Sequence, residues 1–182
     1  MIDGFISKSW RSSNPREGVI AKAYFYALKA HTEAGNIRKS GEEYITHPVA
    51  VSSMLKEYGA DNATLAAALL HDVVEKTDRT LYEIKREFGN EITFLVDGVT
   101  RAKTAFKNFR KIEKFASKDR RVLLIKLADR IHNYQCHGPN NCYIKKNHYA
   151  TKEFLIPLAK SYGFRDIAIR LEEIVEEVEK CQ

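Results

Sequence analysis

The stretch that decides the fold runs from residue 63 to residue 76 and reads ATLAAALLHDVVEK. Its first eight residues are alanine, leucine and one threonine, so a helix formed here has almost no polar surface. Asp61 or Asn62 can cap such a helix at its N-terminus. The sequence therefore predicts a buried, central helix that runs on into a histidine, an aspartate and a glutamate. A buried carboxylate is costly unless it is paired or binds a cation.

Most of the remaining chain also has a helical period, and the alternation typical of strands is almost absent. A chain of 182 residues suits one domain with a substantial core. We therefore predict an all-α, single-domain helical bundle over residues 1–182, with a core at about 20–165 and a C-terminal helix at about 166–181. The predicted helices cover about 15–32, 48–59, 63–76, 80–88, 91–99, 108–116, 119–135, 145–163 and 166–181. For residues 91–99 the β-branched side chains leave a strand as the alternative.

Local signals fix several boundaries of these helices. The residues TLYE at 80–83 form a capping box, and Gly89 ends the helix that they begin. Residues 34–45, which contain two glycines, are expected to form an ordered loop. Pro157 is expected to kink or reset the helix over 145–163. By their spacing on that helix, Phe154, Leu155 and Leu158 are predicted to lie in the core.

Composition and charge narrow the function classes. No apolar run approaches the roughly 18 residues of a membrane span, and the N-terminus does not have the pattern of a signal peptide. Both observations favour a cytoplasmic protein. The three cysteines fit neither a disulfide framework nor a standard zinc motif. The net charge is +6, and a basic run at 103–121 is expected to be a solvated helix face, with attraction of a polyanion as the alternative. No aromatic-rich recognition motif accompanies it, which argues against nucleic acid as a partner.

Two of the predicted helices carry polar residues at helical spacing. On the central helix, His71 and Asp72 lie four and three positions before Glu75, and on the helix over 119–135 Asp129 lies four positions before Asn133. Residues at these spacings share one helix face. Each of two apolar helices is therefore expected to present a carboxylate with a polar neighbour one turn away.

A third polar residue, His47, lies at the start of the helix over 48–59. Together with His71, Asp72 and Asp129 it would provide two imidazoles and two carboxylates, a ligand set that suits Mn²⁺, Fe²⁺, Zn²⁺ or Co²⁺. The alternative is that the His–Asp pair is simply hydrogen-bonded in the core. Spacing alone leaves both interpretations open.

Four motifs then resemble a known family: GEEYITHPVAV at 41–51, AALLHDVVEKT at 67–77, LVDGVT at 95–100 and VLLIKLADRIHN at 122–133. They follow the order found in the hydrolase domain of the RelA/SpoT family, part of the HD metal-dependent phosphohydrolase superfamily. The resemblance covers roughly residues 20–165. The 182 residues have no room for the synthetase domain of long members, so the chain resembles the small, stand-alone alarmone hydrolases.

The resemblance implies a role for each matching residue. It implies that Mn²⁺ is the metal and that its ligands are His47, His71, Asp72 and Asp129. Glu75 matches the first carboxylate of the family's catalytic pair, and Asn133 matches an asparagine that lines the site. Residues expected at the substrate are Arg38, which would pack on the purine base, Lys39 and Ser40 beside it, and Lys145 and Lys146 near the phosphates.

The family reaction removes pyrophosphate from the ribose 3′ oxygen of ppGpp or pppGpp and leaves GDP or GTP. A metal ion can lower the pKa of water and withdraw charge from the phosphoryl group. A carboxylate can take a proton from that water, and basic side chains can hold the charged substrate. The expected partner is therefore a small nucleotide, and the oligomeric state is left open, a homo-oligomer included.

Two departures from the family pattern keep alternatives open. Lys76 stands where the family has the aspartate of its catalytic pair, which replaces a negative charge with a positive one. Glu75 can suffice while Lys76 binds a phosphate, the substrate can have changed, or hydrolysis can be lost in a regulatory nucleotide-binding module. Residues 134–137 also differ, which puts the guanine preference in doubt. The alternative substrates are ppApp, NADPH and 3′-phosphonucleotides.

Overall fold

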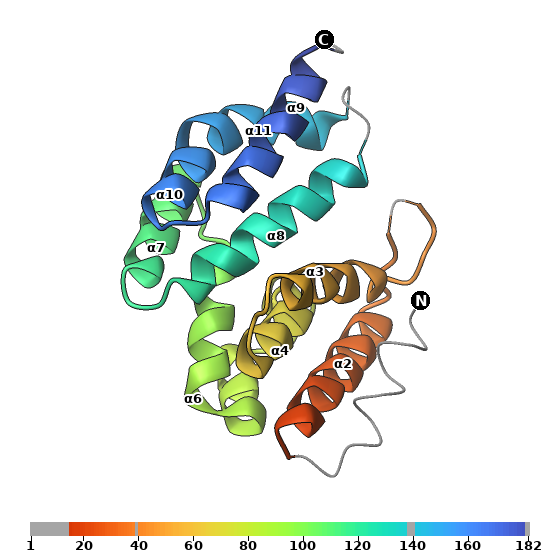
Figure 1. Cartoon of the computed structure of the whole chain (residues 1–182). Coiled ribbons are helices and arrows are strands. Elements are labelled where there is room, and N and C mark those ends of the chain that lie inside the picture. Colours follow the sequence, from red (N-terminus) through yellow and green to blue (C-terminus); the bar gives the residue numbers. More distant parts are fainter. Residues whose placement is uncertain (1–14, 39, 138–140, 181–182) are drawn as a thin grey trace. The chain divides into compact units, whose positions relative to one another are not determined.

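The computed structural model describes residues 15–38, 40–137 and 141–180, and the elements in these ranges are helices (Figure 1). A backbone bridge between Ile37 and Glu43 closes the predicted loop. The all-α class is therefore confirmed. Within the described ranges, no helix combines the length and the hydropathy that crossing a membrane requires. The chain divides into two compact units, the first ending at Ile125 and the second beginning at Lys126. The single domain over residues 1–182 stays a prediction.

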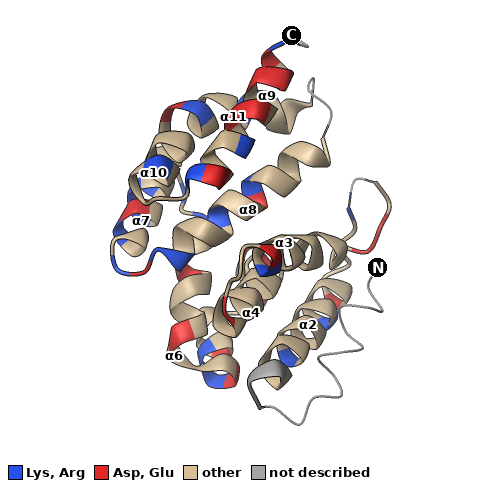
Figure 2. Cartoon of the chain, in the orientation of Figure 1, with Lys and Arg blue, Asp and Glu red and all other residues tan. Residues whose placement is uncertain are grey.

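The first unit is built around α4, the central apolar helix. The helices of this unit are α2 (Pro15–Glu33), α3 (Thr46–Glu57), α4 (Asn62–Leu70), α5 (Val73–Lys76), α6 (Leu81–Val99) and α7 (Ala105–Ala116). Every residue from Thr64 to Leu70 is buried, and α4 contacts α2, α3 and α6. Asp61 caps α4 by accepting a hydrogen bond from the Thr64 N–H at 2.8 Å. Because α4 carries no charged side chain, three helices can pack against it (Figure 2).

The predicted continuous helix over 63–76 is wrong in one respect. The helix ends at Leu70 and a short helix, α5, begins at Val73, with His71 and Asp72 in the turn between them. Asp72 has φ −95° and ψ −8°, at the edge of the right-handed helical region, and its carbonyl accepts from the amides of both Glu75 and Lys76. The His–Asp pair therefore separates α4 from α5, and Glu75 lies on α5 and not on the helix that precedes the pair.

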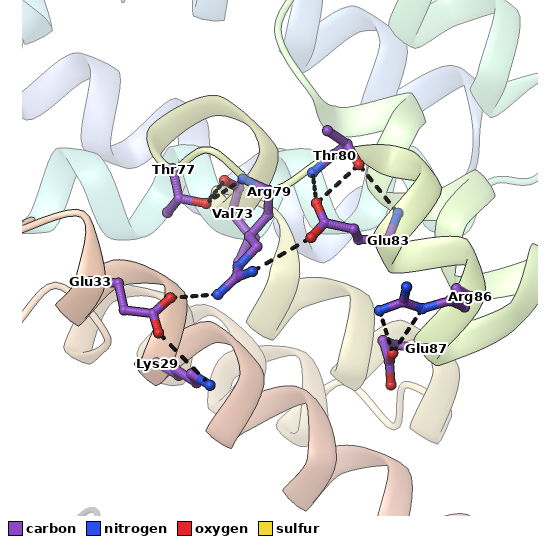
Figure 3. A network of polar contacts seen from close by, with 9 residues as sticks. All are labelled: Lys29, Glu33, Val73, Thr77, Arg79, Thr80, Glu83, Arg86 and Glu87. Atoms are coloured by element: carbon purple, nitrogen blue, oxygen red, sulfur yellow. Dashed lines mark hydrogen bonds and ion pairs between the residues drawn. The ribbon is translucent and has the colours of Figure 1, made fainter.

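Polar contacts attach the end of α5 to its neighbours in the first unit (Figure 3). The Thr77 hydroxyl donates to the Val73 carbonyl at 2.8 Å, which closes the last turn of α5. The Arg79 guanidinium bridges Glu33 on α2 and Glu83 at the start of α6. The chain that leaves α5 is thus tied to two helices.

The predicted boundaries of α6 are confirmed. Thr80 accepts from the Glu83 N–H at 3.3 Å, and the Glu83 carboxylate accepts from the Thr80 N–H at 2.8 Å, so the capping box is present. Gly89 has φ 79° and ψ −179° and breaks the helix into two parts. A positive φ of this size is readily adopted only by glycine, which explains why the predicted break falls there.

The basic run at 103–121 lies on α7 and the turn that follows it, where Lys and Arg are coloured in Figure 2. Several of these cations have acidic neighbours in the first unit. Lys111 pairs with Asp97 at 2.7 Å. Arg121 pairs with three carboxylates, those of Asp61, Glu91 and Asp119. The expected solvated face is therefore partly neutralised by ion pairs.

Close packing inside the first unit makes Gly98 sensitive to substitution. A Cβ atom at this position would lie 2.8 Å from both Val122 methyl groups and 2.9 Å from Phe115 Cδ1. We expect Gly98→Ala to lower the free energy of unfolding by about 1–3 kcal/mol, because the core must expand. Gly18→Ala is the matched control, since nothing lies within 4 Å of a Cβ there. The control should be neutral or stabilising in urea unfolding, and an equally stable Gly98→Ala would contradict the packing.

The second unit begins within α8 (Arg121–Gln135), whose first residues belong to the first unit. It continues through α9 (Cys142–Ala150), the π-helix η1 (Thr151–Leu155), α10 (Ile156–Ser161) and α11 (Arg165–Lys180). Within this unit η1 contacts α9, α10 and α11, and α10 packs on α11. The buried apolar side chains include Ile144, Leu155, Ile167 and Leu171, which form the core of the unit.

The π-helix corrects one core prediction. The sequence predicts a kink at Pro157, and the structure has a reset just before it, because η1 ends at Leu155 and α10 begins at Ile156. A π-turn holds more residues than an α-turn, so it rotates the following side chains out of the α-helical register. Leu155 is fully buried as predicted, Leu158 is half-buried, and Phe154 is 46% exposed. Placing Phe154 in the core was therefore wrong.

Candidate functional site

A buried cluster of two histidines and one aspartate lies in the first unit. His47 is at the start of α3, and His71 and Asp72 are in the turn between α4 and α5. One ligand atom from each lies within 4.8 Å of the other two. The Asp72 Oδ2 atom is 3.8 Å from His47 Nε2 and 3.6 Å from His71 Nε2. His47 is 1% exposed and His71 4% exposed, so the cluster is shielded from solvent on the imidazole side.

Neighbouring groups orient this cluster as a metal site requires. His71 Nδ1 lies 2.7 Å from the Ala68 carbonyl, which can only accept, so Nδ1 carries the proton and Nε2 keeps its lone pair. The Tyr44 hydroxyl donates to Asp72 Oδ2 at 2.5 Å. Such supporting hydrogen bonds are typical of metal-ligating imidazoles and carboxylates. Two imidazole nitrogens and a carboxylate oxygen therefore fit a divalent transition metal ion.

Behind Tyr44 lies a polar layer that the sequence did not indicate. His31 is buried, and its ring centroid is 4.5 Å from that of Tyr44. Burial lowers the pKa of His31 to about 4, although the nearby Asp72 acts in the opposite direction. The imidazole is therefore neutral near pH 7. The Asn36 amide nitrogen lies 3.2 Å from His31 Nδ1 and donates to the main-chain oxygen of Lys76 at 2.7 Å.

Glu75 and Lys76 both have exposed side chains on α5, close in sequence to the cluster. The Glu75 carboxylate accepts a hydrogen bond from the main-chain N–H of Arg101, in the segment that follows α6. The backbone of Lys76 is fixed by Asn36, while its side chain remains in solvent. Glu75 is thus held through its side chain and Lys76 through its main chain, so the charged group of Lys76 stays exposed.

The residues expected at the substrate are placed as follows. The guanidinium carbon of Arg38 lies 5.9 Å above the ring of Tyr44. Ser40, in the tight turn closed by the Ile37–Glu43 bridge, donates to Glu42 at 3.1 Å. Lys39 lies outside the described residues. Tyr44 therefore contacts both the candidate metal ligand Asp72 and the candidate base-packing residue Arg38.

Other predicted site residues lie in the second unit. Asp129 on α8 is buried, and its carboxylate accepts from Asn133 Nδ2 at 2.5 Å and from Lys126 Nζ at 2.8 Å. Burial opposes the charge on Lys126, but Asp129 outweighs it and the pKa of Lys126 is raised, so the lysine stays charged. Lys145 and Lys146 are exposed on α9.

The structure thus groups the predicted residues into two sets. His47, His71 and Asp72 meet in the first unit, and Asp129 contacts Asn133 in the second. That all four ligands bind one ion stays a prediction. Tyr44, His31 and Lys126 were missed by the sequence. The only available signal was that Tyr44 stands three residues before His47, and Lys126 three before Asp129.

The Tyr44 hydrogen bond leads to a test of metal binding. We expect Tyr44→Phe to weaken Mn²⁺ binding about 10- to 100-fold, because Asp72 loses the donor that orients it. Isothermal titration calorimetry on the metal-free protein measures this. Tyr82→Phe, at a side chain that is 74% exposed, is the control. Equal affinity in all three proteins would show that Tyr44 does not orient the ligand.

Comparison with known proteins gives the family context. The GTP pyrophosphokinase of Streptomyces coelicolor is 42% identical over 167 residues. The bifunctional (p)ppGpp synthase/hydrolase SpoT of Escherichia coli is 42% identical over 169 residues. Each match covers 85% of this chain but only 19% and 23% of these two relatives, respectively. The chain therefore spans about a fifth of the length of the curated relatives it matches.

A solved structure is similar over nearly its whole length. It is described as a metazoan ortholog of SpoT that hydrolyzes ppGpp and plays a role in starvation responses. The TM-score is 0.70 at 26% sequence identity, over 87% of this chain and 94% of that one. The resemblance drawn from the sequence motifs is thus confirmed. The HD domain family matches residues 23–156, well over half of the chain, and the chain belongs to this family.

Proposed function

We propose that the chain is a Mn²⁺-dependent hydrolase that removes pyrophosphate from the 3′ position of ppGpp and pppGpp. The buried cluster of His47, His71 and Asp72 carries this proposal, because it offers a metal ion two imidazoles and a carboxylate at close range. The relationship to SpoT and the fold shared with a ppGpp-hydrolysing ortholog support the choice of substrate.

In this proposal His47, His71, Asp72 and Asp129 would hold the ion. When bound, a divalent ion lowers the pKa of water and withdraws charge from the phosphoryl group. Glu75 accepts the proton of the attacking water. The water oxygen forms a bond to the phosphorus attached to the ribose 3′ oxygen, the bond between that phosphorus and the 3′ oxygen breaks, and the 3′ oxygen takes up a proton. The products are pyrophosphate and GDP or GTP.

The remaining residues would bind and orient the substrate. Arg38, already stacked on Tyr44, packs on the purine with its planar cation. Asn133 assists in the site through its contact with Asp129. The cations assigned to phosphates are Lys39, Lys145 and Lys146, with Ser40 beside them. Fixing a charged substrate in this way supplies orientation and charge stabilisation.

Lys76 is assigned to substrate binding, since its side chain is exposed and its backbone is held independently. We expect Lys76→Met to raise KM for ppGpp about three- to tenfold with kcat changed less than twofold, because an attractive charge is lost from ground state and transition state alike. Lys85→Met removes an exposed charge on α6 as the control. If the wild-type protein binds metal but does not hydrolyse ppGpp, and Lys76→Asp does hydrolyse it, the regulatory binding module is favoured instead.

The direct test of the function is product analysis with a small nucleotide panel. The purified chain is incubated with Mn²⁺ and ppGpp, ppApp or NADPH, and free pyrophosphate and phosphate are measured separately. We expect pyrophosphate from ppGpp and loss of the reaction after chelation. Phosphate release from NADPH alone would move the assignment to another nucleotide phosphohydrolase, and no product from any substrate would contradict an enzymatic role.

A further inference from the structure

The second unit contains a buried arginine that the site described above does not use. Arg130 lies on α8 and is 5% exposed. Among the described residues, its Nε and Nη1 atoms have no hydrogen-bond partner. Its guanidinium carbon lies 5.7 Å above the ring of Tyr143 on α9. A cationic fork with two unused buried donors is a rare and costly arrangement in a folded protein.

Arg121, also on α8, is an arginine of this chain whose guanidinium is fully paired with carboxylates. Arg121 donates to the carboxylates of Asp61, Glu91 and Asp119 at 2.7–2.8 Å, although it is less buried than Arg130. Arg130 is more buried, and within the described part of the chain its Nε and Nη1 atoms donate to no acceptor. A buried charge is costly unless an opposite charge pairs with it, and among the described residues these two donors of Arg130 lack such a partner.

The neighbours of Arg130 in the second unit do not provide that anion. The Asp129 carboxylate, next to it in sequence, is paired with Lys126 at 2.8 Å. Burial raises the pKa of the Tyr143 phenol, and burial likewise raises the pKa of Tyr134, so both are neutral near pH 7. Lys126 and Arg130 together bring two positive charges against the one negative charge of Asp129. One positive charge remains in excess.

The group that covers Arg130 is aromatic and partly exposed. Tyr143 stacks on His137 with ring centroids 5.2 Å apart and an interplanar angle of 22°. His137 is held by a hydrogen bond from its Nδ1 to the Asn133 carbonyl at 2.6 Å. Tyr143 is itself half-exposed, so the ring that contacts the guanidinium borders on solvent.

We propose that Arg130 is the centre of an anion-binding site in the second unit, and that its ligand is a phosphate group. A guanidinium presents parallel N–H donors that match two phosphate oxygens, and Nε with one Nη atom forms such a pair. The adjoining Lys126 adds a second cation. That this phosphate belongs to the nucleotide handled by the enzyme rests on the proposed function; the binding of a phosphate does not.

The test measures binding without metal, so that the His–Asp cluster plays no part. The full chain in EDTA is titrated calorimetrically with inorganic pyrophosphate and, in a second arm, with GDP, to separate free from nucleotide-borne phosphate. We expect both to bind, and Arg130→Gln to weaken the affinity about thirtyfold, the loss of a charge-assisted pair of hydrogen bonds. Arg165→Gln removes the same charge from an exposed position of the same unit and should change affinity less than twofold.

Equal affinity of the wild type and Arg130→Gln, or no binding by the wild type, would overturn the site. If Arg130→Gln does not fold, the Nε–H resonance of Arg130 in the wild type replaces it: it should shift on titration with pyrophosphate, and an unmoved signal at saturation overturns the proposal. The nucleotide panel without chelator tests hydrolysis separately. Suppose that the wild type hydrolyses no nucleotide, but binds pyrophosphate and loses this binding in Arg130→Gln. That result would support the anion site and contradict only the enzymatic assignment.

Discussion

Asp72→Asn is expected to weaken Mn²⁺ binding about a thousandfold and to reduce ppGpp hydrolysis below detection. Asparagine has nearly the same shape, but it removes the negative charge that faces both His47 Nε2 and His71 Nε2. A neutral amide is a far poorer ligand for a divalent ion than a carboxylate. The metal affinity is measured by calorimetry, and hydrolysis by pyrophosphate release at saturating Mn²⁺.

The control for this substitution is Asp166→Asn, which removes an exposed carboxylate in the first turn of α11. It should leave metal affinity unchanged. The unfolding midpoint of Asp72→Asn, measured without metal, shows whether the fold is intact. A folded Asp72→Asn protein that binds Mn²⁺ as tightly as the wild type would mean that the cluster is a hydrogen-bonded core pair and not a metal site.

Glu75→Gln is expected to give the opposite combination: kcat for ppGpp falls by about 10²- to 10⁴-fold while Mn²⁺ affinity stays within twofold. The amide oxygen of glutamine can still accept the Arg101 N–H, so the local structure is kept. It cannot take a proton from water, which is the step assigned to Glu75. Steady-state kinetics and calorimetry on the same preparation measure the two quantities.

Glu57→Gln, at the exposed end of α3, serves as the matched control and should have wild-type kcat. If Glu75→Gln loses metal binding together with activity, Glu75 is a ligand and not a base. If it retains full activity, another group accepts the proton, and the assignment of Glu75 is wrong.

The features of the fold that local sequence determines were predicted correctly. The cap at Asp61, the capping box at Thr80 and the break at Gly89 each depend on a few neighbouring residues. The two errors occur where the backbone leaves α-helical geometry inside an apolar segment. The helix ends at Leu70 and a π-turn precedes Ile156, and neither changes the helical spacing from which helices are predicted.

The candidate site divides in the same way. His47, His71 and Asp72 could be predicted because a buried imidazole or carboxylate is conspicuous beside an apolar run. The contacts of Tyr44 and Arg130 could not, because both depend on tertiary packing that brings distant residues together, as the Tyr44–Asp72 hydrogen bond and the burial of Arg130 show. Tyr44 matters through Asp72, which is distant in the sequence, and Arg130 through two donor atoms that have no partner among the described residues.

The hydrogen bond from Asn36 to position 76 reaches the main-chain oxygen, a group that every amino acid possesses. The side chain of Lys76 is exposed and contributes nothing to that bond. Most substitutions at this position should therefore keep the contact between α5 and the loop that follows α2, so that the charge at position 76 can vary while the local backbone stays fixed.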